Sequence, residues 1–248
     1  MGWFLGAKPV GSRLVPSTRS VRTSALAAAI ALIVVGCGGG SKDNGVAKLS
    51  AADALKRVEA ALKKVETVHV NGHISSQGQS IQLDLRDKAG AGTGTINIGG
   101  GEIDVVRTGD DIYVKGDQVA LSAFGASSAQ ATLVAGKWLR QSVSARGSFS
   151  SLAALLDSTA LFSNVTSPTG TVKTGTTTTL NGQKVFTLID SSADGNGTLY
   201  VAETGDPLPV RVDQPGSSGG SLDFEYGVPV DVKVPSGAVD LSKLLSGG

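Results

Sequence analysis

The chain has 248 residues, of which 22 are basic and 21 acidic, and it contains a single cysteine. This balance of charge gives no basic footprint for a nucleic acid, and one cysteine excludes a disulfide within the chain. The length is sufficient for one large domain or two small ones, each with a core of its own.

The first 36 residues have the pattern of an export signal. A run of about a dozen apolar residues begins at Ala25 and is too short to cross a membrane, which takes roughly 20. The charged residues before this run are all basic: Lys8, Arg13, Arg19 and Arg22. We therefore predict that residues 1–36 are a signal peptide and that the protein is exported. Without these four cations the mature chain has 18 basic and 21 acidic residues.

The apolar run ends in a sequence that resembles the bacterial lipobox, which is an apolar residue, a small or apolar residue, a small residue and a cysteine. Val34 takes the place where leucine is commoner, and Val35, Gly36 and Cys37 follow. In such signals the cysteine is acylated on its thiol and, after cleavage, on its new amino group. We expect Cys37 to become a lipidated first residue at the outer face of the cell membrane, because several acyl chains hold firmly where one does not. The polar, glycine-rich residues from Gly38 onward disfavour a membrane-spanning anchor or a buried free cysteine.

Residues 37–48 are rich in glycine and polar residues, which predicts a lipidated flexible linker. One domain is predicted over residues 49–248, and it opens with a helix. Ser50 and Asp53 form an S-x-x-D capping box. The mixed charges of the helix favour packing of its apolar stripe on a sheet over an interfacial position on a membrane. That stripe has helical spacing and consists of Leu55, Val58, Leu62 and Val65.

From Thr67 the apolar residues recur at every second position, in short runs that extend to Lys115. One apolar and one polar face per strand is typical of an antiparallel meander. Residues 117–136 lose this alternation, which predicts one or two short helices or a mobile flap. A strand is predicted at 137–141, and a second helix begins at Ser150 and ends before Pro168.

The last third of the chain returns to strand spacing, and Val230, Val232 and Val234 are predicted to close the sheet. The strands expected before them cover residues 171–179, 184–190, 198–203, 208–213 and 221–226. About eleven strands and two main helices predict a single α+β domain with a large antiparallel sheet.

Six segments carry a family resemblance through their order along the chain. They are DIYVKG at 111–116, GKWL at 136–139, GTLYVA at 197–202, TGDPLPVRV at 204–212, FEYGVPV at 224–230 and VPS at 234–236. Together with the lipobox and the first helix, they resemble the actinobacterial LppX/LprA/LprF/LprG lipoproteins over most of residues 37–245. The resemblance implies an unclosed antiparallel half-barrel with helices on its concave side, as in lipoprotein carriers of the LolA type.

The resemblance further implies that an acylated lipid or glycolipid binds in an apolar cavity between sheet and helices. A membrane transporter is a further partner that would fit such a carrier. The alternative is a non-catalytic lipoprotein that senses or scaffolds a membrane or cell-envelope partner. The strand alternation gives the candidates for the cavity lining: Val70, Ile74, Leu83, Leu85, Ile96, Ile98, Val105, Val114 and Leu199.

Two features that look chemical do not predict a site. His69 and His73 are four residues apart on a predicted strand, about 13 Å by rise alone, so we expect two separate histidines on the wet face and no metal. The G-x-S-x-G string at 216–220 has no histidine after it and follows Pro215, which predicts a hairpin loop. We therefore predict no catalytic residue, metal or cofactor, and expect a protein that is not an enzyme.

Overall fold

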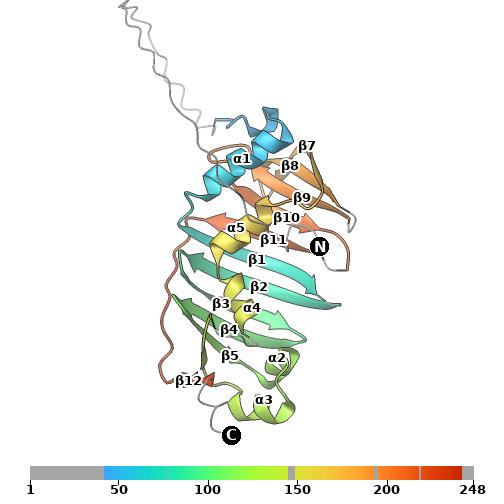
Figure 1. Ribbon diagram of the computed structural model, residues 1–248. Helices are drawn as coiled ribbons and strands as arrows, with labels where there is room; N and C mark the ends of the chain where they lie inside the picture. Colours follow the sequence, from blue (N-terminus) through green and yellow to red (C-terminus); the bar gives the residue numbers. More distant parts are fainter. Residues whose placement is uncertain (1–41, 77, 145–148, 193–194, 218, 242–248) are drawn as a thin grey trace, which may run out of the picture.

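The computed structural model describes residues 42–76, 78–144, 149–192, 195–217 and 219–241. In this part of the chain twelve strands form one sheet, in the order β12-β6-β5-β4-β3-β2-β1-β11-β10-β9-β8-β7 (Figure 1). The first strand of this order is not paired with the last, so the sheet is unclosed. Five α-helices accompany the sheet among the described residues. The predicted α+β class with a large, unclosed and mostly antiparallel sheet is confirmed.

Neighbouring strands are antiparallel except for β12 and β6, which pair in parallel through Val239 and Leu139. The twelve strands are β1 Thr67–Ser76, β2 Gln79–Lys88, β3 Ala91–Ile98, β4 Gly101–Thr108, β5 Asp111–Gly116, β6 Leu139–Ser142, β7 Thr171–Leu180, β8 Gln183–Ser192, β9 Gly195–Ala202, β10 Pro209–Gln214, β11 Gly220–Tyr226 and β12 Val239–Asp240. The predicted closing strand at Val230–Val234 is wrong, because these residues join no strand and the sheet ends instead at β12. The pairing of β7 with β8 shifts register between Thr174 and Thr177.

The first predicted helix is confirmed as α1, Ala51–Leu62. Ser50 caps it, since the Ser50 side chain accepts a hydrogen bond from the Asp53 backbone N–H at 3.2 Å. Ala54, Leu55, Val58, Ala61 and Leu62 are buried. The apolar stripe therefore packs into the core, as its spacing predicted.

Residues 117–136 form two short helices, α2 Gln118–Ala123 and α3 Ser128–Val134. The second predicted helix is divided into α4 Ser150–Leu155 and α5 Ser158–Thr166. The division falls at Asp157, whose side chain accepts a hydrogen bond from the Ala160 backbone N–H at 3.1 Å and so caps α5. Helices α1, α4 and α5 lie along one face of the sheet (Figure 1).

The linker was predicted to extend to residue 48, but the folded domain already begins at residue 43. Asp43 forms a β-bridge with Thr204. The Asn44 side chain donates hydrogen bonds to the carbonyls of Ala202 at 2.8 Å and Gly205 at 3.2 Å. A 3-10 helix, η1 Val46–Lys48, follows, and Val46 is fully buried. Residues 43–48 are thus fixed to the turn after β9.

Candidate functional site

The strand register places large apolar side chains of β1 to β5 on one face of the sheet. Val70 pairs with Leu85, and Val105 pairs with Val114, with Gly94 between Leu85 and Val105. We call this side, which carries α1, α4 and α5, the helix face. The opposite side, with His69 and Asp84, is called the outer face.

Eight of the nine predicted cavity residues are buried, and Ile74 is half-buried. All nine belong to or pack against one apolar cluster, together with Val58 of α1 and Leu152 and Leu156 near α4. They come from five neighbouring strands and, for Leu199, from β9. The structure thus brings them together as one layer beneath the helices, and their contact with a lipid remains a prediction.

Three hollows on the described surface are lined by residues that lie away from the space between the sheet and the helices. Two are lined largely by polar residues of the outer face and its loops, with His73 shared between them. The third lies at the β7–β8 turn around Asn181. These hollows are open and polar, so they differ from the apolar cavity that the resemblance implies.

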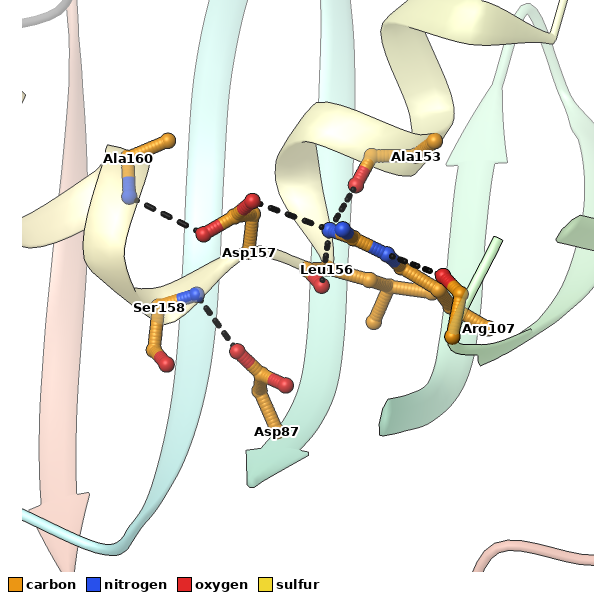
Figure 2. Close-up of polar contacts among 8 residues, drawn as sticks. Asp87, Arg107, Ala153, Leu156, Asp157, Ser158 and Ala160 are labelled. Carbon is orange, nitrogen blue, oxygen red and sulfur yellow. Dashed lines mark hydrogen bonds and ion pairs between the residues drawn. The ribbon is translucent and has the colours of Figure 1, made fainter. Parts of the chain in front are cut away.

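A polar cluster lies within the apolar helix face, at the junction of α4 and α5 (Figure 2). Arg107 of β4 donates from Nη1 to the carbonyl oxygens of Ala153 at 3.0 Å and Leu156 at 2.9 Å. The same nitrogen is 3.1 Å from Oδ2 of Asp157. A cation at the end of a helix stabilises its unpaired carbonyls, so Arg107 fixes the end of α4 and the start of α5 on the sheet.

Asp87 of β2 completes this cluster. Its Oδ2 accepts a hydrogen bond from the Ser158 backbone N–H at 2.5 Å. The residue is only 4% exposed, and its Oδ1 has no hydrogen-bond partner among the described residues. Desolvation raises the pKa of the Asp87 carboxyl, although the bond from Ser158 and the nearby Arg107 act in the opposite direction.

Sequence reasoning missed the Asp87–Arg107–Asp157 cluster, although the strand alternation carries a signal for part of it. Asp87 continues the inward series of Leu83 and Leu85, and Arg107 continues that of Ile103 and Val105. Charged residues at inward positions of nearby strands indicate a buried pairing, because an unpaired buried charge is strongly destabilising.

Tyr226 adds a second unpartnered polar atom on the helix face. Its phenol oxygen is buried without a hydrogen bond to any described residue, and burial raises its pKa well above the usual range. Its ring stacks with that of Phe224 at 6.5 Å between centroids and lies 6.3 Å from that of Phe162 in α5. The helix face is therefore apolar, with isolated polar atoms at the end where β1 starts.

The two histidines lie on the outer face, but they differ in surroundings. His73 is exposed, as predicted. His69 is buried, since its Nδ1 lies 3.0 Å from Oε2 of Glu225 and its Nε2 lies 3.0 Å from Oδ1 of Asp84. Both histidines thus lie on the predicted face, but His69 is not exposed there, because carboxylates from both neighbouring strands lie over its ring.

The remaining predictions concern metals, nucleophiles and the export signal. No group of three metal-ligating side chains occurs among the residues that the structure describes. Strands β10 and β11 are consecutive in the chain and pair antiparallel, which confirms a hairpin at the G-x-S-x-G string. In the same described part of the chain, no helix has the length and apolarity to cross a membrane. Val34, Val35, Gly36 and Cys37 lie outside the described residues.

No protein-family model matches the sequence, and a comparison with curated proteins also finds no match. The solved structures do give matches. The crystal structure of LprF from Mycobacterium bovis aligns with a TM-score of 0.51 at 14% identity, covering 80% of this chain and 100% of LprF. The chain has the fold of LprF.

A second similarity is to the Mycobacterium tuberculosis lipoprotein LppX, with a TM-score of 0.49 and 18% identity over 74% of this chain and 97% of LppX. At 14% identity the likeness to LprF concerns the path of the backbone and the order of the strands. It confirms the structural resemblance predicted from the segments of the sequence. This likeness gives no information on side chains, so it does not bear on the polar cluster of Asp87, Arg107 and Asp157.

Proposed function

We propose that this protein is an exported lipoprotein that binds acylated lipids or glycolipids between its sheet and its helices and carries them at the outer face of the cytoplasmic membrane. The observation that supports this most is the helix face, where apolar residues of many strands form one layer under α1, α4 and α5. The family resemblance of the sequence supports the same function, as does the LprF fold. The role is non-catalytic.

The anchor in this proposal is Cys37, and its support is the lipobox of Val34, Val35 and Gly36. The nine apolar residues Val70, Ile74, Leu83, Leu85, Ile96, Ile98, Val105, Val114 and Leu199 are the proposed lipid contacts. Because they are packed in the described chain, an acyl chain has to displace helices α4 and α5 to reach them. The contacts of Arg107 with α4 and with Asp157 would have to break for these helices to move.

The energetics of such a carrier restrict what it does alone. An acyl chain gains about 0.8 kcal/mol per buried methylene relative to water, but it gains nearly the same in a bilayer. Transfer from a bilayer into an apolar pocket is therefore close to isoenergetic. The protein holds and hands over lipid without an energy source, while a membrane transporter or a downstream acceptor sets the direction.

The test is mass spectrometry of lipid that co-purifies with protein extracted from its native membrane. We expect at least one acylated lipid in stoichiometric amount, and loss of binding of a pyrene-labelled phospholipid when that lipid is added in excess. The Cys37→Ala variant should be released from the membrane or left unprocessed. Protein free of lipid that also fails to bind the pyrene probe would rule out the carrier.

A second candidate is a non-catalytic sensor or scaffold for a membrane or cell-envelope partner. One observation favours it, namely that eight of the nine candidate residues are at most 6% exposed and the described hollows lie elsewhere. Crosslinking in intact cells separates the two functions. A scaffold would give a crosslinked protein partner and no bound lipid, whereas a carrier would give bound lipid from the same cells.

A further inference from the structure

Helix α1 uses its apolar stripe inside the domain and presents its other side to solvent. Leu55, Val58 and Leu62 are at most 8% exposed. Lys56, Ala60 and Lys63 lie three and four residues apart, so they share one side of the helix. All three are exposed, as are Arg57 and Lys64. The surface that α1 leaves to a partner is therefore cationic rather than apolar.

These cations exceed the neighbouring acids when the residues that follow α1 are included. From Ala51 to Glu66 there are four basic residues and three acidic ones, Asp53, Glu59 and Glu66. Asp53 pairs with Lys56 at 3.7 Å. Arg57, Lys63 and Lys64 form no ion pair with any described residue. The mature chain as a whole has more acidic than basic residues, so this surface opposes the charge of the rest of the domain.

The chain between Cys37 and the folded domain is short. Among the described residues, Asp43, which lies six residues after Cys37, bridges Thr204. Six residues span at most about 20 Å when fully extended. Twelve strands at about 4.8 Å spacing extend over roughly 50 Å along the curved sheet. Only the end of the domain with β9, β7 and α1 can therefore lie near an acylated Cys37, while α3 lies at the other end (Figure 1).

We propose that the basic surface of α1, formed by Lys56, Arg57, Lys63 and Lys64, lies against anionic lipid headgroups of the membrane that holds Cys37. This inference rests on the proposed lipid anchor and adds an orientation to it. Each lysine or arginine near an anionic surface strengthens binding by roughly fivefold. The acyl chains hold the protein at the membrane, and the cations of α1 set which side faces it.

The experiment uses the acylated mature protein on vesicles of phosphatidylcholine with or without phosphatidylglycerol. Because Cys37 is the only native cysteine, an introduced cysteine is the one free thiol for a fluorophore. Ala60→Cys places the label on the basic surface of α1, and Ala129→Cys places a matched label on α3. Both alanines are exposed. Quenching by lipid-linked spin labels then reports which label lies at the bilayer.

We expect strong quenching at position 60 in anionic vesicles and weak quenching at position 129. Neutral vesicles or 1 M salt, where the Debye length falls to about 3 Å, should weaken the quenching at position 60, because only the tether then holds the label near the bilayer. The triple change Arg57→Gln, Lys63→Gln and Lys64→Gln should lower the ratio of docked to undocked protein by about a hundredfold. The matched triple change Lys88→Gln, Lys137→Gln and Lys233→Gln should leave it unchanged.

Three outcomes would overturn the inference, and they differ from one another. Equal quenching at positions 60 and 129 in protein that floats with the vesicles would remove the orientation and keep the anchor. Quenching at position 60 that ignores phosphatidylglycerol would remove the role of charge. Acylated protein that does not float with any vesicle would overturn the anchor itself, and the orientation with it.

Discussion

Arg107 and Asp157 join the sheet to the helices that cover it, with 3.1 Å between Nη1 of the arginine and Oδ2 of the aspartate. The Arg107 side chain is only 14% exposed, and the same nitrogen also holds the carbonyls of Ala153 and Leu156. One side chain thus satisfies the end of α4 and a carboxylate at the start of α5. Its removal leaves buried acceptors without a donor.

We therefore expect Arg107→Ala to lower the free energy of unfolding by about 2–4 kcal/mol. The matched change is Arg140→Ala, because Arg140 is 46% exposed and its ion pairs to Asp111 and Asp240 are 3.6 and 3.5 Å long. That variant should lose less than about 1 kcal/mol. Urea unfolding measures both, and hydrogen exchange should show faster opening of α4 and α5 in Arg107→Ala. Equal losses in the two variants would contradict this role of Arg107.

Asp87 should make stability fall as the pH rises. Its pKa is raised in the folded protein, first by desolvation, so the unfolded chain loses its proton at lower pH than the folded one. Stability from this group is present below the unfolded pKa and is lost between that pKa and the raised folded pKa. Asp87→Asn removes the loss, because the amide oxygen still accepts the bond from Ser158. The difference in stability between Asp87→Asn and wild type should therefore grow in favour of the variant as the pH rises from acidic to neutral.

Asp117 provides the control for pH with the opposite sign. Backbone N–H groups of Ala120 and Glu102 lower the pKa of its carboxyl. Stability from Asp117 is present above its unfolded pKa and is lost as the pH falls through the folded pKa. Asp117→Asn should therefore cost most at neutral pH and least in acid. Urea titrations at several pH values compare each variant with wild type. A variant whose stability changes with pH as wild type does would refute the assignment for that residue.

His69 should contribute to stability where His73 does not. The His69 ring lies between the carboxylates of Glu225 and Asp84, each at 3.0 Å. Its loss removes the polar contacts of the ring with charged groups and leaves the two acids facing each other, so His69→Ala should cost about 1–3 kcal/mol. His73→Ala, in an exposed position of the same strand, should stay within about 0.5 kcal/mol of wild type. Thermal and urea unfolding of both variants provide the comparison.

Asn44 should hold the N-terminal segment on the turn after β9. Besides its two bonds to that turn, its Oδ1 accepts the Val46 backbone N–H at 3.0 Å. Asn44→Ala should cost about 1–3 kcal/mol and speed hydrogen exchange at Val46. Lys48→Ala is the control, since Lys48 is 79% exposed and its pair with Asp43 is 3.6 Å long. It should change stability by less than about 1 kcal/mol. Unaltered exchange at Val46 in Asn44→Ala would contradict the role of that side chain.

The spacing of apolar residues was sufficient to predict most of the helices and strands. The two-residue spacing of Leu83 and Leu85 and the helical spacing of Leu55 and Val58 each set a face, and those faces are the ones that are buried. The errors arose where tertiary contacts decide. Val230–Val234 alternates like a strand but finds no partner, and residues 43–48 look like a linker but dock on Thr204. Local spacing shows neither the lack of a pairing strand beside Val230–Val234 nor the contact with Thr204.

The candidate site was predictable to a smaller extent. The apolar lining follows from strand alternation, because inward positions of a sheet are read directly from every second residue. The cluster of Asp87, Arg107 and Asp157 depends on a loop 50 residues beyond Arg107 in the chain reaching the sheet. Such a contact follows from the packing of α4 and α5, which the sequence alone leaves open.

The irregularity of β7 affects how two copies of this protein could meet. This ten-residue strand forms one edge of the sheet, so its outer row of backbone donors and acceptors could pair with a second molecule. With the proposed lipid anchor, copies would meet more often than they do in solution, which would favour such pairing. The register shift between Thr174 and Thr177, with Gly175 inside it, interrupts the straight edge that a neighbour would need. This break in the β7–β8 ladder disfavours the joining of two molecules edge to edge.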